Sequence, residues 1–170
     1  MVEVRTATRS DADEIARVHV ESWRVGYRGI VADEVLDSAD FATNRHAWWQ
    51  AWQFQPGSDV IVATDAGAVV GFASYGPERS DSDRLVARGE VYAFYLDPSA
   101  WGSGAAAPLM RDAEDRLRAI GFSDAVLWVF RDNPRARRFY EKAGWSSSGE
   151  LSFFDLAGTQ LAEVRYDRRL

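Results

Sequence analysis

The sequence lacks or is poor in residues on which several kinds of protein chemistry depend. It contains no cysteine, which excludes disulfide bonds, thiolate metal ligands and a cysteine nucleophile. Its only histidines, His19 and His46, are too few to form a zinc site on their own. The longest apolar runs, such as residues 125–130, are far shorter than a helix that crosses a bilayer. We therefore expect no metal, no membrane segment and no cysteine chemistry.

Basic residues are also scarce relative to acidic ones. Lys and Arg together number 20 against 26 Asp and Glu, which gives a net charge of −6. Nucleic acid attracts positively charged surfaces, so we expect no nucleic-acid partner, whereas a cationic partner suits this charge. Residues 1–5 carry charges where a secretory signal requires a continuous apolar stretch. Together with the lack of cysteine, this predicts a cytoplasmic location.

The length and composition are typical of one folded domain. The chain has 170 residues, of which 46% are hydrophobic and 27% are charged. A chain of this length can bury most of its apolar surface in one core, and no linker or repeat interrupts it. We expect a single domain over residues 1–170.

Hydrophobic periodicity and turn residues predict strands at 2–6, 60–63, 68–75, 90–96, 124–130, 145–154 and 161–166. Helices are predicted at 11–25, 41–54, 105–120 and 134–144, with a short helical turn at 33–36 and a loop at 77–89. The order is β-αα-β-β-β-α-β-α-β-β. It predicts the α/β class, here an α+β mixed sheet with helices on both faces.

A glycine-rich loop joins the predicted strand 90–96 to the helix that follows it. Gly102 and Gly104 precede the helix N-terminus, where free N–H groups and the helix dipole favour an anion such as a phosphate. An ordinary turn would use the same glycines. Gly102-x-Gly104-x-x-Ala107 also matches the dinucleotide fingerprint of an NAD(P)-dependent oxidoreductase. The preceding antiparallel hairpin and the residues between strand and glycines favour another phosphate-bearing cofactor.

Two segments carry a resemblance to a known family. Trp101-Gly102-Ser103-Gly104-Ala105-Ala106 resembles the Gln/Arg-x-x-Gly-x-Gly/Ala loop of the GNAT N-acetyltransferases, with Trp101 in place of Gln or Arg. Residues 133–145 are similar to the family's Asn-x-x-Ala-x-x-Phe-Tyr-Glu-Lys-x-Gly-Phe/Trp pattern at every defined position. The resemblance extends to residues 19–29 and 163–166, so it covers essentially the whole chain.

The resemblance implies a GNAT-type acyl-CoA N-acyltransferase fold and acetyl-CoA as the cosubstrate. It implies direct transfer of the acetyl group to a primary amine of a small-molecule or peptide acceptor, with no metal and no covalent enzyme intermediate. The residues it assigns to the coenzyme are Phe94, Tyr95, Leu96, Trp101, Gly102, Ser103, Gly104, Ala105, Ala106, Asn133, Arg135, Arg138 and Tyr140.

The resemblance also suggests roles within this set. The backbone from Gly102 to Ala106 would hold the pyrophosphate, and Arg135 or Arg138 the outer phosphate. Asn133 would cap its helix and bind the pantetheine arm, although capping alone explains this residue almost as well. N–H groups of residues 94–96 would polarise the thioester carbonyl.

Tyr140 and Glu90 are the predicted catalytic residues. Tyr140 would donate a proton to the coenzyme thiolate, and Glu90 would accept one from the amine. The plainer alternatives are a packed aromatic ring for Tyr140 and a solvated strand-end residue for Glu90. Trp23 and Tyr27 are expected to line the acceptor site.

A protein with this sequence could also bind an acyl-CoA without turning it over. The changes at Trp101, Ala107 and Pro108 relative to the usual family pattern would accompany such a loss. A non-catalytic acyl-CoA-binding module therefore stays an alternative, and a homodimer stays open.

Overall fold

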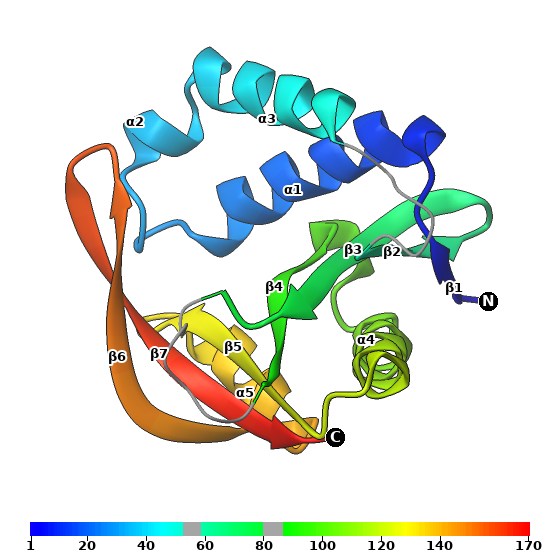
Figure 1. The fold of residues 1–170 in the computed structure, drawn as a ribbon. Coiled ribbons are helices and arrows are strands. Elements are labelled where there is room, and N and C mark those ends of the chain that lie inside the picture. The colour runs from blue at the N-terminus through cyan, green and yellow to red at the C-terminus, as the bar shows by residue number, and fades with distance from the viewer. Residues whose placement is uncertain (53–58, 80–86) are drawn as a thin grey trace. The chain divides into compact units, whose positions relative to one another are not determined.

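The computed structural model describes residues 1–52, 59–79 and 87–170 (Figure 1). The strands are β1 (Glu3–Thr6), β2 (Val60–Asp65), β3 (Ala68–Pro77), β4 (Gly89–Leu96), β5 (Asp124–Phe130), β6 (Ser146–Leu156) and β7 (Thr159–Arg169). The helices are α1 (Ala12–Gly26), α2 (Asp33–Leu36), α3 (Ala39–Ala51), α4 (Ala106–Ile120) and α5 (Pro134–Lys142), with short 3-10 helices η1 (Arg9–Asp11) and η2 (Pro98–Ala100).

The strands form one mixed sheet in the order β1-β2-β3-β4-β5-β7-β6. β4 and β5 run parallel, whereas β1–β2, β2–β3, β5–β7 and β6–β7 are antiparallel pairs. A parallel pair needs a crossover connection, and α4 supplies it between β4 and β5. The predicted mixed α/β sheet and its element order are confirmed.

The chain divides into two compact units, each of which is described by itself. The first unit comprises Met1–Ser74 and Ala93–Asp112, and the second comprises Tyr75–Tyr92 and Ala113–Leu170. Strands β3 and β4 and helix α4 pass through both units.

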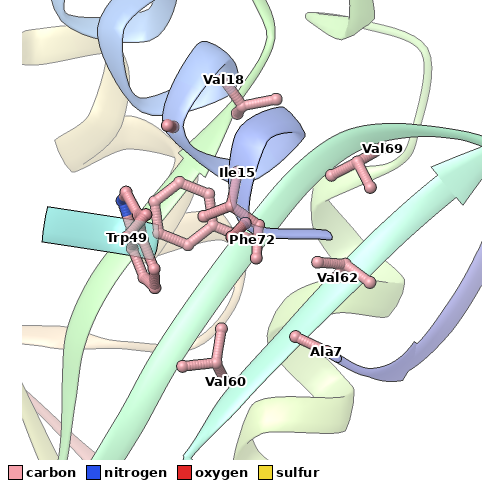
Figure 2. Packing of buried hydrophobic residues seen from close by; sticks show 10 residues of the cluster. Ala7, Ile15, Val18, Trp49, Val60, Val62, Val69 and Phe72 are labelled. Atoms are coloured by element: carbon pink, nitrogen blue, oxygen red, sulfur yellow. The ribbon is translucent and has the colours of Figure 1, made fainter. Parts of the chain in front are cut away.

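The core of the first unit forms where α1 and α3 pack on the β2–β3 hairpin. Apolar residues of α1 recur at helical spacing, which places Ile15 and Val18 on one buried face. They meet Trp49 of α3 and Phe72 of β3, all almost fully buried (Figure 2). Burial of each such side chain stabilises the fold by about 1.5–3 kcal/mol.

A capping box between Thr8 and Asp11 holds the 3-10 helix η1, which leads directly into α1. Asp11 accepts from the Thr8 backbone N–H (2.8 Å) and from both terminal nitrogens of Arg5 (2.8 Å each). The hydrogen bond from Arg5 is the main cause that lowers the pKa of Asp11 to about 2. A cap of this kind contributes about 1 kcal/mol.

The second unit is built on the β5–β7–β6 part of the sheet. Trp145 and Leu117 are buried there, and the Trp145 indole N–H donates to Glu114 of α4 (3.0 Å). This bond satisfies a polar group inside the core, where an unmade bond would be costly.

Several predicted elements differ in extent from the structure, among them the strand predicted at 161–166, which spans Thr159–Arg169. The helix predicted for 41–54 spans Ala39–Ala51, and residues 53–58, where its predicted end falls, lie outside the described residues. Most of the predicted loop 77–89 also lies outside them, at residues 80–86.

Candidate active site

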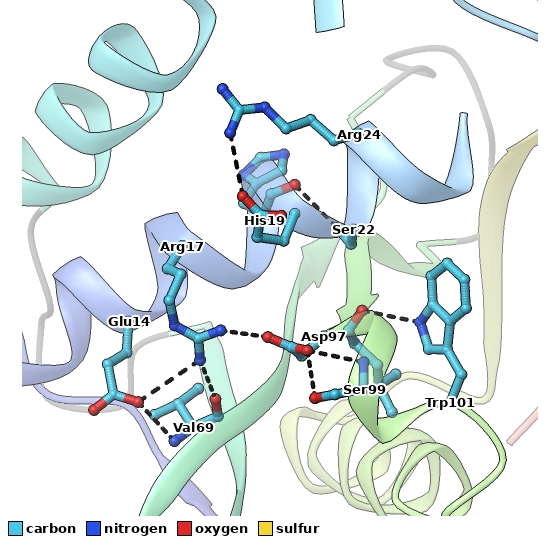
Figure 3. A network of polar contacts seen from close by, with 11 residues as sticks. Glu14, Arg17, His19, Ser22, Arg24, Val69, Asp97, Ser99 and Trp101 are labelled. Carbon is cyan, nitrogen blue, oxygen red and sulfur yellow. Dashed lines mark hydrogen bonds and ion pairs between the residues drawn. The ribbon is translucent and has the colours of Figure 1, made fainter. Parts of the chain in front are cut away.

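The segment after β4 is held at its start by an arginine of α1. Arg17 forms an ion pair with Asp97 and donates to the Val69 carbonyl oxygen (2.8 Å). Asp97 caps η2 by accepting from the Ser99 N–H (2.9 Å). Figure 3 shows how these contacts join α1, β3 and the loop. The glycine loop therefore begins from a fixed point in the first unit.

Trp101 occupies the loop position where the GNAT pattern has Gln or Arg. Its indole N–H donates to the carbonyl oxygen of Leu96, the last residue of β4 (3.1 Å; Figure 3). Its side chain thus fastens the loop to the strand end. Trp101, which departs from the family pattern, therefore has a structural role in this loop.

Both loop glycines have a backbone conformation that other residues rarely adopt. The φ angle is +78° at Gly102 and +92° at Gly104. A Cβ added at either position would meet no atom of the protein within 4 Å. A side chain there would be disfavoured by backbone strain and would project away from the protein atoms.

The N–H groups of this loop divide into two sets. Ser103 donates to the last carbonyl of η2 (3.2 Å), and Ala105 donates to the Ser103 hydroxyl (3.3 Å). Within the described parts of the chain, no acceptor is recorded for the N–H groups of the alternating residues Gly102, Gly104 and Ala106. These groups lie at or just before the N-terminus of α4, where the helix dipole adds to their attraction for an anion.

The pairing of β4 with β5 covers only the first part of β4. It runs from Gly89 opposite Ala125 to Val91 opposite Leu127. β4 itself continues to Leu96 and therefore reaches the residues predicted to contact the thioester.

Trp23 and Tyr27, the residues predicted for the acceptor, belong to an aromatic cluster of the first unit. Trp23 is 4% exposed, and its ring lies edge-on to Tyr27 with centroids 4.9 Å apart. The Tyr27 hydroxyl lies 3.5 Å from that of Tyr95 on β4. His19 stacks on the Tyr95 ring at 4.9 Å. The structure brings both predicted acceptor residues beside Tyr95, which was predicted for the coenzyme.

His19 is neutral in this cluster. Burial, and secondarily the positive charge of Arg45, lowers its pKa to about 3. Its Nδ1 accepts from the indole N–H of Trp49 (3.1 Å), so the proton of the neutral ring is on Nε2.

The second unit holds Asn133 and Tyr140 on α5. The predicted cap is confirmed, since the Asn133 side chain accepts from the Ala136 N–H (3.2 Å). Tyr140 is 8% exposed, and its ring centroid lies 5.4 Å from that of Phe139 and 6.2 Å from that of Tyr166. The Tyr140 ring is therefore held by packing on both sides.

The two faces of α5 differ in exposure as the spacing predicts. One face is buried or half-buried and the other is exposed. The exposed face presents the basic residues Arg135, Arg138 and Lys142.

Glu90 is buried, which contradicts the alternative of a solvated strand-end residue. It is 4% exposed and accepts from the backbone N–H of Arg79 (2.8 Å) and from its guanidinium (3.2 Å). The Arg79 guanidinium also lies 4.0 Å from the centre of the Tyr92 ring. Glu90 is buried because it lies opposite Val126 in the central parallel pair of the sheet.

Glu163 shares the surroundings of Glu90 and was not among the predicted site residues. Burial and then the charge of Glu90 raise its pKa, while the charge of Arg79 acts in the opposite direction. Glu163 lies on β7 opposite Phe130 of β5. No local pattern marks such a residue, because the contact depends on how distant strands pair.

Two features are absent from the described residues. No group of three or more His, Cys, Asp or Glu side chains within them could hold a metal ion. None of their helices is both long and apolar enough to cross a membrane.

Comparison with known proteins identifies the family. Residues 15–145 match the Acetyltransferase (GNAT) family, and this range includes both the glycine loop and α5. The chain belongs to the GNAT acetyltransferase family. Because Gly102 and Gly104 lie within a GNAT match, this assignment replaces the oxidoreductase alternative.

Relatives and solved structures agree with the GNAT assignment. The chain is 36% identical over 165 residues to YuaI of Bacillus subtilis (strain 168), described as an uncharacterized N-acetyltransferase, with 96% of this chain and 91% of YuaI covered. PaiA N-acetyltransferase from Thermoplasma acidophilum, solved with coenzyme A, has the same fold, with a TM-score of 0.77, 19% identity and coverage of 100% and 99%. YncA from Salmonella typhimurium, solved with its cofactor acetyl-CoA, gives a TM-score of 0.71 at 22% identity over 99% and 94%. The protein is therefore an acyltransferase of the GNAT type, an N-acetyltransferase.

Proposed function

We propose that this enzyme transfers the acetyl group of acetyl-CoA directly to a primary amine of a small-molecule or peptide acceptor. The observation that carries the proposal is that the N–H groups of Gly102, Gly104 and Ala106, at the start of α4, have no acceptor among the described residues. Donors at alternate positions of a positive-φ loop, reinforced by a helix dipole, suit the pyrophosphate of a coenzyme. Arg135 or Arg138 on the exposed face of α5 is the proposed partner of its outer phosphate.

Acyl transfer requires three steps that the protein can assist. The amine must lose a proton, the oxygen of the thioester carbonyl must be stabilised as it gains charge, and the departing sulfur must receive a proton. In the reaction the amine nitrogen forms a bond to the acetyl carbon and the carbon–sulfur bond breaks. The products are an amide and the free thiol of CoA.

Backbone N–H groups of β4 from Phe94 to Leu96 are proposed to stabilise the carbonyl oxygen. This proposal rests on the family resemblance and on the extension of β4 beyond its pairing with β5. Tyr140 is proposed to donate the proton to sulfur, because it carries the hydroxyl of the family pattern and its ring is buried against Phe139 and Tyr166.

Glu90 is proposed to take part in removing the amine proton. Its burial and its proximity to Glu163 place two carboxylates in one region of the second unit. Burial and the charge of Glu90 raise the pKa of Glu163, and Arg79 forms an ion pair with Glu90.

The pH dependence of kcat/KM tests this role. Glu90→Gln keeps the size of the side chain but cannot accept the proton, so kcat/KM should fall most at low pH, where free amine is scarce. Glu163→Gln is the matched neighbouring variant, and it should lower kcat/KM less. A pH–rate profile of Glu90→Gln that coincides with that of the wild type would exclude Glu90 as the base.

A further inference from the structure

Arg45 of α3 lies among the aromatic side chains of the first unit. Its guanidinium carbon is 5.1 Å from the centre of the Trp23 ring and 5.6 Å from that of Phe41. Its own side chain is half-buried. A charged group is rarely taken out of water unless something compensates it.

No carboxylate compensates Arg45 within the described residues, since its recorded contacts are those with the aromatic rings. The arginines of the neighbouring helix α1 differ in this respect. Arg17 forms an ion pair with Asp97, and Arg24 forms one with Glu21. Contact with aromatic rings offsets part of the cost of burying a guanidinium, and an anion would offset more.

The pKa values of Arg45 and His19 both reflect the burial of this positive charge. Burial lowers the pKa of Arg45, and Tyr95 acts in the opposite direction. The charge of Arg45 contributes, after burial, to the low pKa of His19. His19 is therefore a neutral neighbour and supplies no negative charge. Arg45 therefore places a positive charge in this cluster, although the chain as a whole carries a net charge of −6.

We propose that Arg45 binds a carboxylate of the acceptor, so that the acceptor is an amino acid or another primary amine that carries a carboxylate. The planar fork of a guanidinium matches a carboxylate in two parallel hydrogen bonds. The rings of Trp23 and Phe41 hold the guanidinium, and the half-buried ring of Phe41 would contact the apolar part of the same molecule. This inference rests on the proposed function, because it names the acceptor class of that reaction.

The charge at Arg45 could instead serve only to join α3 to α1 through its contact with Trp23. Both roles predict a loss of stability when Arg45 is replaced. They differ in substrate choice, because only the binding role makes the preference for a carboxylate depend on this residue.

The test compares common L-amino acids with the primary amides of the same amino acids, with acetyl-CoA as donor and CoA release as readout. The wild type should prefer the acids. Arg45→Met, which keeps an unbranched apolar side chain and removes the guanidinium, should raise KM for the acid about 10- to 100-fold with little change in kcat, because a charge-assisted hydrogen bond is lost. KM for the amide should change little. Arg45→Lys should recover part of the preference, and Arg9→Met, at an exposed arginine of η1, should behave like the wild type.

Each outcome decides the proposal. If amides are used as well as acids, and Arg45→Met affects both equally, the carboxylate role is overturned while the acetyltransferase function stands. If no amine of the panel releases CoA, the proposed function is in question, and thermal shift decides the binding role separately. Stabilisation by acids but not amides, lost in Arg45→Met, would support it, and no stabilisation by any acid would overturn it.

Discussion

At the scale of single residues, the packing of the Tyr140 ring allows its hydroxyl to be tested alone. Tyr140→Phe keeps the contacts with Phe139 and Tyr166, so coenzyme binding should be preserved. Loss of the proton donor should lower kcat by about a hundredfold and leave KM for acetyl-CoA nearly unchanged. Steady-state kinetics with a saturating amine measure both constants.

The matched control for Tyr140→Phe is Tyr166→Phe. The Tyr166 hydroxyl donates to Glu141 (2.8 Å) and accepts from Arg137 (3.0 Å), so its loss should lower the melting temperature. Its kcat should stay near that of the wild type. Normal turnover by Tyr140→Phe would show that the Tyr140 hydroxyl is not the proton donor and that the residue serves only in packing.

His19 should make stability depend on pH in a defined window. Its folded pKa of about 3 lies below the value of about 6.5 for an unfolded chain, so the unfolded state takes up a proton first as the pH falls. The stability is fully present above that unfolded value and decreases below it. Between about pH 7.5 and about pH 5.5 the free energy of unfolding should fall by about 1.4 kcal/mol on this account.

Urea unfolding of the wild type and of His19→Gln at both pH values isolates this contribution. The part due to His19 should vanish in His19→Gln and persist in His46→Gln, which removes the other histidine. Asp11 does not contribute to the change in this window. Its pKa of about 2 in the folded protein lies below its unfolded value, so its contribution to stability is lost only in more acidic solution. Equal pH slopes for wild type and His19→Gln would show that His19 is protonated in the folded protein.

At the scale of elements, the glycine loop can be tested with a pair of matched substitutions. Gly104 and Gly67 have similar φ angles, +92° and +85°, and an added Cβ would meet no protein atom within 4 Å at either. Valine should therefore strain both turns by a similar amount, about 1–2 kcal/mol. Only Gly104→Val should also raise KM for acetyl-CoA, because its side chain would stand where we propose the pyrophosphate binds.

Calorimetric titration of CoA into the two variants measures this difference. Gly67→Val should bind CoA like the wild type. Unchanged CoA affinity in Gly104→Val would remove the loop from the coenzyme site.

Elements marked by local signals are the part of the fold that the sequence predicts well. The hairpin turn at residues 65–67 and the cap at Asn133 depend on residues close together in the chain, and both are confirmed. The loop hydrogen bonds of Ser103 and Ala105 could not be predicted, because they depend on the path of the backbone.

Side chains that depend on contacts between distant segments were the hardest to predict. From the sequence, Glu90 cannot be distinguished from an ordinary strand-end glutamate. Its surroundings depend on the pairing of β4 with β5 and on the ion pair with Arg79. No sequence pattern marks Arg45. Its surroundings depend on contacts with the aromatic rings of Trp23 on α1 and Phe41 on α3. The acceptor class could not be inferred from the sequence for this reason.

At the scale of the whole molecule, the net charge and the local charge of Arg45 favour different groups on the acceptor. A charge of −6 favours a cationic group, whereas the guanidinium of Arg45 favours an anionic one. An amino acid satisfies both, because it carries an ammonium and a carboxylate. That residues 1–170 act as one domain stays a prediction.

Direct transfer of acetyl from acetyl-CoA to an amine can be measured in one assay. The protein is incubated with acetyl-CoA with and without a panel of amines and amino acids, and CoA, acetylated amine and protein mass are quantified together. We expect one acetylated amine for each CoA released, and unmodified protein when no amine is present. Failure to release CoA with every amine, or acetylation of the protein itself as an intermediate, would contradict direct transfer.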